Sequence, residues 1–592
     1  MPTNKAKFQT ILYPTKHICS EEALYLHREE SFILFDGYFN LFYLKKYHEY
    51  CDIRRLELRL VAKGIKKIVL MHDKDAIREV SVENMLVVLE LPYEEYKDGV
   101  FWFKAEPVDI DGDWEIRGSY EGEVNVSRDV KVAIGICTFK REKYVLRNLE
   151  SMLEYFVDNS EIRALFHVFL VDNGRTLSGL DEFTKLRDKA CEIGGDSFLT
   201  LIENRNTGGT GGFIKAMEEV IAKKEELGLT NLMLLDDDAV FDPEIFLRLV
   251  GFLKALKTEY EDITVGGAMW REDMPYMLYA FGEHHYKFNV NSPAHMLNLR
   301  DFDTCIRSEL TCSSVEKSLY SGWWCCTYSM KIITKENLPM PLFIHFDDIL
   351  FCRQHSAGRI ALIPGIGVWH QGFELRFPGV NHYYNTRNQL ITAAVMDDIS
   401  SFEVARWTAK QLTAPLLTLR YEEMNLAYRG IKDFLKGPEW LDYVDGEELH
   451  LNIMGEYKSK VVMKPLEEVL DAEDYERLKA DKLSEEARKK ANMSFWKERR
   501  KGKAFKKVIT LNGWLLPPDK ELGYYCNADS PWSLYKKGKV LLYEPEANRG
   551  YIETRKLGEF IKCARRGVWS AILIVLNYRR VAKKYRKRAG RC

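Results

Sequence analysis

The chain has 592 residues, of which 46% are hydrophobic and 29% charged, and its formal net charge is −2. This composition excludes a disordered or fibrous protein and is sufficient for several domains with hydrophobic cores of their own. The near-neutral charge argues against nucleic acid as a general partner.

The twelve cysteines form no regular framework. The close pairs are the adjacent Cys325 and Cys326 and the loosely spaced Cys305 and Cys312, and no CxxC motif suggests zinc. Free thiols in a reducing cytoplasm are therefore expected. The N-terminus lacks an apolar stretch of signal-peptide length, and no run of 18 apolar residues occurs, so we expect no transmembrane span.

Residues 1–128 consist of short apolar and aromatic runs separated by turn residues, as in IKKIVLM (65–71), NMLVVLEL (84–91) and GVFWFKAE (99–106). Little of this region has helical periodicity, which favours an antiparallel β-sandwich. We expect its aromatic side chains to lie in the core, and stacking on carbohydrate is the alternative.

Residues 129–400 alternate strand-like and helical segments. Buried strands are predicted within 131–138, 164–172, 197–203 and 231–235. Such alternation predicts a mostly parallel α/β sheet that binds a nucleotide at the carboxyl ends of its strands. In NTGGTGGF (206–213) the glycines either allow a close approach to phosphate or form a tight turn before a helix.

Three adjacent carboxylates, Asp236, Asp237 and Asp238, follow the strand at 231–235. Alternating side chains send Asp236 and Asp238 to one side and Asp237 to the other. Such a DxD arrangement suits a divalent metal that bridges a nucleotide diphosphate. The alternative is an acidic loop before the next helix, for which Asp242-Pro243-Glu244 is a good start signal.

A second carboxylate pair, Asp347 and Asp348, follows the apolar run PLFIHF. One carboxylate pair can bind a metal while the other supplies a general base, and Asp348 is the candidate for the base. N-capping of the next helix is the alternative explanation for Asp347 and Asp348. His370 ends the apolar run IPGIGVW; added to two aspartates it gives a ligand set that suits manganese. Trp323 and Trp324 could stack on a sugar, with core packing the default for at least one of them.

Residues 401–592 are charged and mainly helical in pattern, with helices expected near 401–436 and 465–500. The last segment, GVWSAILIVLNYRRVAKKYRKRAGRC, joins a short apolar run to a basic run. It is too short to span a bilayer but could lie on an anionic leaflet, where each Lys or Arg adds about 1 kcal/mol. The alternative is a terminal core helix with a charged, solvated end.

Together, several motifs resemble the family 2 glycosyltransferases of GT-A fold, most closely the polymerising bacterial galactofuranosyltransferases. The resemblance covers roughly residues 1–430 and rests on TFKR (138–141), VDNG (171–174), NTGGTGGF, DDD (236–238), GWW (322–324), FIHFDD (343–348) and VWH (368–370). It implies an N-terminal β-sandwich, a Rossmann-like GT-A domain and a C-terminal helical region.

The resemblance also implies roles for individual residues. Asp236, Asp238 and His370 match the ligands of Mn²⁺ or Mg²⁺. The other implied roles are donor binding by Arg141, Asp172, Asn206, Asp236 and Asp237, base catalysis by Asp348, and acceptor binding by Asp347, Trp323, Trp324, Glu283 and His345.

Departures from the family pattern lie on the acceptor side. His345 stands where the family shows a lysine, the motif of Asp348 lacks an acidic residue two positions on, and no tryptophan follows Glu283 within ten residues. The identity of the acceptor and the linkage is therefore less constrained than the donor.

We expect an inverting, metal-dependent transferase that moves galactofuranose from UDP-galactofuranose to a hydroxyl of a growing, lipid-linked surface glycan. Peripheral association with the cytoplasmic face of the membrane is expected, and homo-oligomerisation is left open. The alternatives are a transferase with another nucleotide sugar, such as a rhamnosyltransferase, a nucleotidyltransferase that releases pyrophosphate, and a non-catalytic carbohydrate-binding protein.

Overall fold

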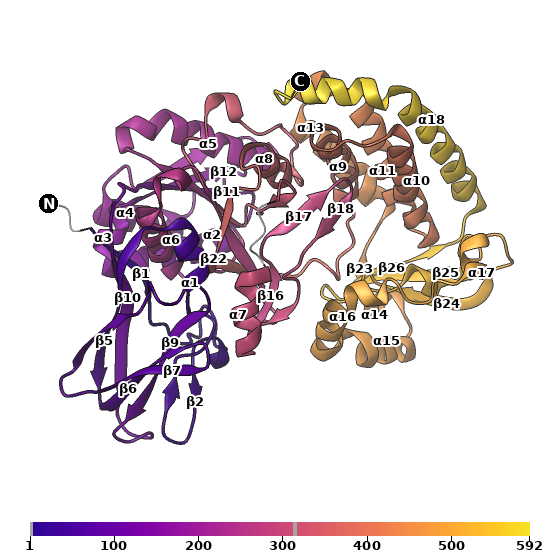
Figure 1. Ribbon diagram of the computed structural model, residues 1–592. Coiled ribbons are helices and arrows are strands. Elements are labelled where there is room, and N and C mark those ends of the chain that lie inside the picture. The colour runs from indigo at the N-terminus through magenta and orange to yellow at the C-terminus, as the bar shows by residue number, and fades with distance from the viewer. Residues whose placement is uncertain (1–3, 312–315, 592) are drawn as a thin grey trace. The chain divides into compact units, whose positions relative to one another are not determined.

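The computed structural model describes residues 4–311 and 316–591, which form two compact units (Figure 1). The first unit comprises the chain up to His285 together with Val290–Pro339 and Phe351–Gln371. The second comprises Tyr286–Asn289, Met340–Leu350 and the chain from Gly372 onward. The predicted division into 1–128, 129–400 and 401–592 stays a prediction.

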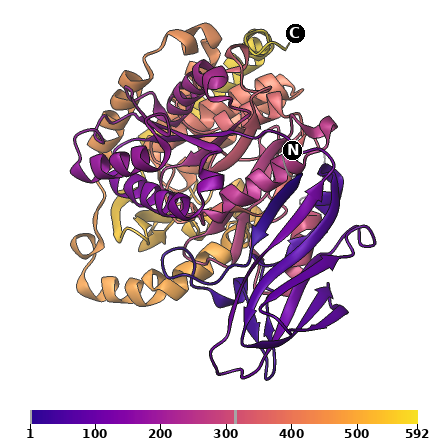
Figure 2. The ribbon, with the colours of Figure 1, turned by 90° about the vertical axis from the view of Figure 1, so that its left-hand side faces the viewer.

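The N-terminal region is the predicted β-sandwich, whose strands are drawn in indigo and violet in Figure 2. One sheet has the order β1-β10-β5-β8, and the other has the order β2-β3-β9-β6-β7 with β4 beside β9. Leu56, Leu58 and Leu60 in β5 are buried while the residues between them reach solvent, as expected for a strand with one face on a core. The elements are β1 (Lys5–Thr10), η1 (Glu22–Leu24), β2 (His27–Arg28), β3 (Ile33–Leu34), β4 (Phe42–Tyr43), α1 (Leu44–Tyr50), β5 (Ile53–Lys63), β6 (Ile65–His72), β7 (Asp75–Ser81), β8 (Leu86–Leu91), β9 (Val100–Pro107) and β10 (Glu115–Val124).

The predicted α/β sheet follows, with the order β13-β12-β11-β14-β21-β15-β16-β19 and β22 beside β15. Strands β13, β12, β11 and β14 run parallel, β21 is antiparallel to both of its neighbours, and β22 is parallel to β15. The carboxyl ends of β11, β12 and β14 therefore meet at one edge. The elements are β11 (Val132–Thr138), α2 (Glu142–Asp158), α3 (Ser160–Arg163), β12 (Phe166–Asp172), α4 (Asp181–Gly194), β13 (Leu199–Glu203), α5 (Gly208–Leu227), β14 (Asn231–Asp236), α6 (Glu244–Ala255), η2 (Thr258–Tyr260), β15 (Thr264–Arg271), β16 (Met277–Ala280), β17 (Glu283–Tyr286), β18 (Asn289–Asn291), β19 (Leu297–Asn298), α7 (Phe302–Thr311), β20 (Leu319–Tyr320), β21 (Cys325–Ser329), η3 (Lys335–Asn337), α8 (Asp347–His355) and β22 (Ile360–His370).

Helix α6 joins the sandwich to the α/β sheet through a continuous core. It is buried almost all round, and a Cβ at Gly251 would stand 2.2 Å from the Lys7 carbonyl oxygen of β1, so only glycine permits this approach. Arg248 is buried in α6 and donates to the Phe39 carbonyl at 2.6 Å, while Glu244 accepts from the backbone N–H of Thr10. Because these polar groups are paired across the junction, the sandwich and the sheet form one unit.

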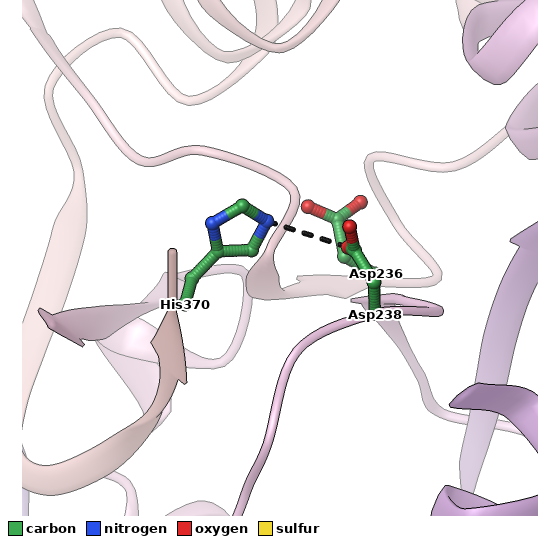
Figure 3. Close-up of side chains that lie close together, drawn as sticks. All are labelled: Asp236, Asp238 and His370. Atoms are coloured by element: carbon green, nitrogen blue, oxygen red, sulfur yellow. Dashed lines mark ion pairs between the residues drawn. The ribbon is translucent and has the colours of Figure 1, made fainter. Parts of the chain in front are cut away.

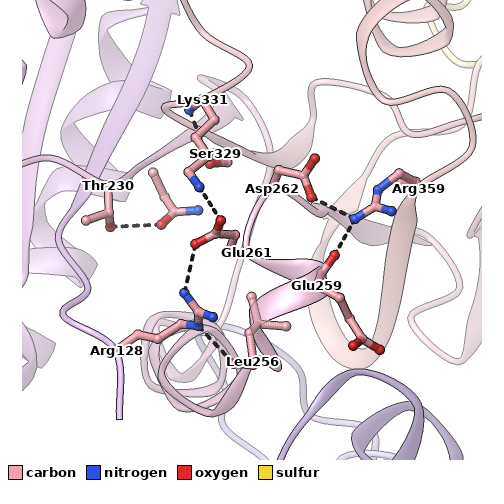
Figure 4. A network of polar contacts seen from close by, with 10 residues as sticks. Arg128, Thr230, Leu256, Glu259, Glu261, Asp262, Ser329, Lys331 and Arg359 are labelled. Atoms are coloured by element: carbon pink, nitrogen blue, oxygen red, sulfur yellow. Dashed lines mark hydrogen bonds and ion pairs between the residues drawn. The ribbon is translucent and has the colours of Figure 1, made fainter. Parts of the chain in front are cut away.

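A surface network connects several strand ends of this unit (Figure 4). Arg128 donates to the Leu256 carbonyl at 2.8 Å and to Glu261, which also pairs with Lys331. Arg359 donates to the Glu259 carbonyl and to Asp262. Exposed ion pairs of this kind contribute little stability individually. Their cations Arg128, Lys331 and Arg359 lie close to the start of β11, the end of β21 and the start of β22.

The second unit is mainly helical, as predicted, and also contains a sheet with the order β23-β26-β25-β24. The helix expected at 465–500 is interrupted, because Ser484 has an extended backbone and caps a new helix. The elements are α9 (Asn381–Met396), α10 (Ser401–Leu417), α11 (Tyr421–Leu435), α12 (Pro438–Tyr443), α13 (Gly446–Lys460), β23 (Lys464–Pro465), α14 (Leu466–Val469), α15 (Ala472–Leu478), η4 (Lys479–Leu483), α16 (Glu485–Glu498), α17 (Phe505–Ile509), β24 (Asp519–Tyr525), η5 (Pro531–Leu534), β25 (Lys537–Glu544), β26 (Arg549–Thr554) and α18 (Leu557–Arg588).

The C-terminal helix α18 has two different apolar faces. Ile574, Tyr578 and Tyr585 are buried in the core of the second unit, so the predicted tail is in part a core helix. Val568 and Leu576 lie on the other face and are exposed. Among the described residues, no helix is long and apolar enough to cross a membrane. The ten cysteines of the described ranges are unbridged, and Cys312 and Cys592 lie outside these ranges.

Candidate active site

The three aspartates lie where β14 ends, at the carboxyl edge of the parallel sheet. Asp236 is the last residue of the strand, and Asp237 and Asp238 follow in the turn before α6. As expected from the alternation, Asp236 and Asp238 lie together with His370, and Asp237 is not part of this group. Asp237 pairs with Arg141, which also reaches Asp238. The acidic loop therefore offers two carboxylates to one point, as a DxD motif requires.

His370 reaches this point because β22 ends beside the aspartate turn. Val240 and Trp369 exchange two backbone hydrogen bonds of 2.8 and 2.7 Å, which join the turn to the end of β22. One ligand atom each from Asp236, Asp238 and His370 lie within 4.8 Å of one another (Figure 3). These backbone bonds thus join two residues that are 129 positions apart in sequence.

The electrostatics of this group indicate a cation site. Burial raises the pKa of Asp236 to about 7, and the charge of Asp238 adds to this effect. Burial would also raise the pKa of Asp238, but the hydrogen bond and charge of His370, together with the charge of Arg141, outweigh burial and lower it. Burial would lower the pKa of His370, yet Asp238, 3.3 Å from its Nε2, raises it to about 9. In the absence of metal, a proton on His370 partly replaces the cation that the carboxylates favour.

The donor atoms fit a divalent metal such as Mn²⁺. Two carboxylates and one imidazole nitrogen form a mixed oxygen and nitrogen set that suits manganese. Nδ1–H of His370 donates to the Gln371 carbonyl at 2.8 Å, and this bond leaves Nε2 as the nitrogen that faces Asp238. Such a second hydrogen bond orients most histidines that bind metals. His370, Asp236 and Asp238 are thus the residues that would hold the ion.

Arg141 lies directly before α2 and pairs with two of the aspartates. Its Nη1 is 3.0 Å from Oδ1 of Asp237 and 2.5 Å from Oδ2 of Asp238. The guanidinium lies at the carboxyl edge and is half exposed, so it could also bind an anionic ligand there. The structure therefore brings Arg141 to the metal group, and its role in donor binding stays a prediction.

Asn148, which the motifs did not indicate, holds the aspartate turn from α2. Its side-chain amide donates to the carbonyls of Asp237 and Ala239, both at 2.9 Å, and it is almost completely buried. An asparagine on the apolar face of a helix, between Val145 and Met152, was the available sequence signal. A buried polar side chain generally has specific partners.

Asp172 and Asn206, the other residues predicted to bind the sugar donor, accept hydrogen bonds from nearby backbone N–H groups. The buried carboxylate of Asp172 accepts from the N–H groups of Gly174, Thr176 and Leu177 at 2.7 to 2.8 Å. Asn206 accepts from the N–H of Gly208 at 3.1 Å, directly before α5. Both residues therefore shape the loops at the carboxyl edge, and direct contact with uridine or diphosphate stays a prediction.

The glycine-rich segment forms the first turns of α5. A Cβ at Gly212 would stand 1.9 Å from Sγ of Cys137 in β11, so this glycine allows the helix to lie close against the sheet. At Gly209 a Cβ would meet no atom within 4 Å. Close packing therefore explains Gly212, and the open space at Gly209 leaves the approach of a phosphate as a prediction for the helix start.

Trp323 and Trp324 have different surroundings. Trp323 is 4% exposed, donates to the Tyr328 hydroxyl at 3.0 Å and packs edge-on against Phe213. Trp324 is partly exposed and donates to the Gly267 carbonyl at 3.1 Å. Trp323 is therefore the tryptophan of this pair that packs in the core, as expected for at least one of them. Of the two, Trp324 is the one with a side chain that reaches solvent.

Glu283 is a buried acid in β17. Its Oε1 accepts from Ser292 at 3.3 Å, and among the described residues Oε2 has no hydrogen-bond partner. Burial raises the pKa of Glu283 to about 8. A buried, largely neutral carboxyl group can donate a hydrogen bond to a sugar hydroxyl, but its contact with an acceptor stays a prediction.

The FIHFDD segment belongs to the second unit and has an unusual backbone. Phe343, His345 and Phe346 all have positive φ angles, 74°, 65° and 67°. Non-glycine residues in this region are strained and concentrate at functional sites. Asp347 and Asp348 follow as the first two residues of α8, where the positive end of the helix dipole favours their negative charge. His345 precedes this helix, and its contact with an acceptor stays a prediction.

Two buried residues of α9 hold this strained segment. The side-chain amide of Asn388 donates to the carbonyls of Ile344 at 2.7 Å and His345 at 3.0 Å, and also approaches that of Leu342. Arg387 donates to the Leu342 carbonyl at 2.7 Å and, through Nε, to Oδ1 of Asn388. Sequence reasoning missed this pair, although two polar residues on a buried helix face were a signal.

Comparison with known proteins gives consistent findings. Residues 129–383 match the family model described as "Glycosyltransferase like family 2". The chain is 24% identical over 451 residues to the galactofuranosyltransferase GlfT2 of Mycobacterium tuberculosis. This alignment covers 69% of this chain and 66% of that protein. It is 25% identical over 438 residues to GlfT2 of Mycolicibacterium smegmatis, which covers 69% and 65%. The match thus spans slightly less than two thirds of these relatives.

Among solved structures, the chain is similar to mannosyltransferase PcManGT from Pyrobaculum calidifontis, in complex with GDP-Man and Mn2+. That match has a TM-score of 0.29 and 13% identity over 52% of this chain and 75% of the other.

Proposed function

We propose that the protein is an inverting, metal-dependent glycosyltransferase that transfers galactofuranose from UDP-galactofuranose. The match of residues 129–383 to the family model described as "Glycosyltransferase like family 2" supports the class of reaction. The observation that carries the proposal is the convergence of Asp236, Asp238 and His370 at the carboxyl edge of the sheet. The names of the two mycobacterial relatives support galactofuranose as the sugar.

When bound, the metal would neutralise the diphosphate of the leaving UDP, so that no acid is needed to protonate the leaving group. Asp236, Asp238 and His370 would hold the ion, Arg141 would add positive charge beside it, and Asn148 keeps the turn in place. These groups are fixed before the donor binds, which limits the reorganisation that the reaction requires.

Asp348 would act as the general base. It accepts the proton of an acceptor hydroxyl while that oxygen attacks the anomeric carbon opposite the UDP, which inverts the configuration. Support comes from its place after a strained segment and in the first turn of α8. Removal of a general base typically costs about 10² to 10⁴ in rate.

One set of experiments tests the identity of the sugar donor, the type of reaction and the identity of the general base. The protein is incubated with Mn²⁺, a synthetic galactoside and UDP-galactofuranose, UDP-galactopyranose or dTDP-rhamnose in turn, and products are scored by mass. Transfer from another donor and none from UDP-galactofuranose would refute the proposed donor, and release of pyrophosphate instead of UDP would identify a nucleotidyltransferase.

Asp348→Ala should abolish transfer and retain UDP binding, whereas Asp238→Ala should weaken metal-dependent UDP binding. Near-normal turnover of Asp348→Ala would contradict the base assignment.

The acceptor that we propose is a lipid-linked surface glycan at the cytoplasmic face of the membrane, to which the protein binds peripherally. The exposed apolar face of α18, flanked by basic residues, supports this part. Deletion after Gly567 would remove Ile574 and Tyr578 from the core, so a surface change is the better test. Leu576→Ser should reduce sedimentation with anionic vesicles and leave transfer to soluble acceptors intact; unchanged sedimentation would contradict this membrane role.

A further inference from the structure

The second unit contains a basic cavity that the proposed reaction does not use. Its volume is about 460 Å³, and one face of α11 forms it together with the end of α13 and part of α18. Six cations line it against three carboxylates: Arg429, Lys432, Lys436, Lys460, Lys562 and Arg566 against Glu422, Asp433 and Glu456.

Each carboxylate of the cavity is already paired with one of these cations. Glu422 pairs with Lys460 at 3.0 Å, Glu456 with Arg429 at 3.2 Å, and Asp433 with Lys436 at 2.6 Å. Lys562 pairs with Glu559 at 3.1 Å, so two positive charges, those of Lys432 and Arg566, remain in excess. A compact anion is the ligand chemistry that such a cavity favours.

The two excess cations lie against one aromatic ring. The Arg566 guanidinium is 4.6 Å from the centroid of the Tyr428 ring, and the Lys432 ammonium is 5.8 Å from it. Arg566 also donates to the side chain of Asn425. The ring holds the cations without neutralising them, so their N–H groups stay available to phosphate oxygens.

An apolar groove adjoins the basic cavity and shares Tyr428 and Arg566 with it. Its volume is about 880 Å³, and Phe560, Ile561, Ala564, Arg565, Val568 and Trp569 of α18 complete its lining. Ile561, Val568 and Trp569 are 58%, 64% and 51% exposed. An exposed apolar surface of this kind, next to a basic cavity, is typical of a ligand site and not of an ordinary surface.

We propose that these two cavities together bind a lipid phosphate: a phosphate or diphosphate head group in the basic cavity, with its apolar chain along α18. The proposal rests on the proposed function in one respect, that the lipid is the anchor of the acceptor glycan. The head group is recognised by the excess charge around Lys432 and Arg566, and the chain by Ile561 and Val568.

The test uses the full chain in EDTA, so that no divalent metal can recruit diphosphate to the aspartates. Farnesyl diphosphate is titrated calorimetrically below its micelle concentration, and inorganic diphosphate and farnesol are titrated separately. We expect one equivalent of farnesyl diphosphate to bind at least about tenfold more tightly than either part alone, because both the charge and the chain contribute. Equal binding of inorganic diphosphate or of farnesol, or no binding of farnesyl diphosphate, would overturn the proposal.

Matched variants locate the site. Lys432→Glu and Ile561→Ser should each weaken binding of farnesyl diphosphate about tenfold. Arg580→Glu and Leu576→Ser change similar exposed residues of α18 outside both cavities and should leave binding unchanged. If the control variants weaken binding as much as the cavity variants, the helix surface and not the cavity pair is the binding surface.

The titration contains no sugar donor, so its outcome does not depend on whether the protein transfers galactofuranose. Conversely, Lys432→Glu should transfer galactofuranose to a soluble galactoside at the wild-type rate. A loss of that activity would show that the residue acts in the reaction rather than in holding a lipid, and would also overturn the proposal.

Discussion

Replacement of Asn388 tests whether the strained FIHFDD segment positions the base. Asn388→Leu removes the donors to the Ile344 and His345 carbonyls, while the bond from Arg387 to Leu342 can persist. A buried carbonyl left without a partner costs about 1–3 kcal/mol, and a more exposed bond contributes about 0.5–1.5 kcal/mol. The expected local loss is therefore about 1.5–4.5 kcal/mol.

This loss is comparable to the strain that the segment carries. Each non-glycine residue in the left-handed region costs about 1–2 kcal/mol, so Phe343, His345 and Phe346 together carry about 3–6 kcal/mol. Without the bonds from Asn388 the segment should relax and displace Asp348. A displacement of about 1 Å can reduce a rate by about 10².

The assay measures kcat and KM for the sugar donor, together with UDP binding and the melting temperature. We expect Asn388→Leu to lower kcat about 10²-fold and to leave UDP binding within about threefold, because the metal group lies in the first unit. Gln389→Leu, one position along α9, leaves these bonds in place and serves as the control. A kcat within about threefold of wild type, with Asp348→Ala inactive, would refute the positioning role of Asn388.

Three further predictions follow from individual contacts. Asp238→Asn should lose most of the metal-dependent UDP binding, measured by titration with and without Mn²⁺; an increase of UDP affinity by Mn²⁺ as large as in the wild type would contradict the ligand role. Burial raises the pKa of Glu283 to about 8, so its contribution to stability is present below the pKa of the unfolded chain and is lost as the pH rises through 8. Glu283→Gln should therefore flatten the decline of the melting temperature between pH 5 and pH 9, and an unchanged decline would contradict the buried acid. Trp323→Ala should cost about 3–5 kcal/mol in a denaturant titration because it empties a core position, whereas Trp324→Ala should mainly raise KM for the acceptor; the opposite pattern would reverse their assignments.

The sequence was informative wherever a local pattern has one physical meaning. Alternating polarity predicted the sandwich, and strands alternating with helices predicted the parallel sheet, because burial of one face determines the periodicity. The DxD geometry also followed locally, since alternation alone places Asp236 and Asp238 on one side. The start of α6 at Glu244 was predicted from its own cap, with Asp242 accepting from the Glu244 N–H.

The sequence could not distinguish between two structural explanations where both produce the same local pattern. Trp323 and Trp324 are neighbours of the same type, and only packing against Phe213 and Tyr328 shows which one is buried. The glycine-rich segment likewise fitted both a helix start and a phosphate site. The contact between Gly212 and Cys137 comes from a different strand, so the segment itself could not reveal it.

Periodicity and motifs were sufficient to predict the classes of secondary structure and the acidic turn, and the family resemblance supplied the candidate ligands and base. The contact between His370 and Asp238 could not be predicted in this way, because the bridge between Val240 and Trp369 joins segments distant in sequence. The tertiary structure also assigned Asn148 and Asn388 to the loops that they hold, and it divided α18 into a core face and an exposed face. The physical reason is common to all of these: hydrogen bonds and burial depend on neighbours in space, and periodicity along the chain records only that a side chain is buried, not against what.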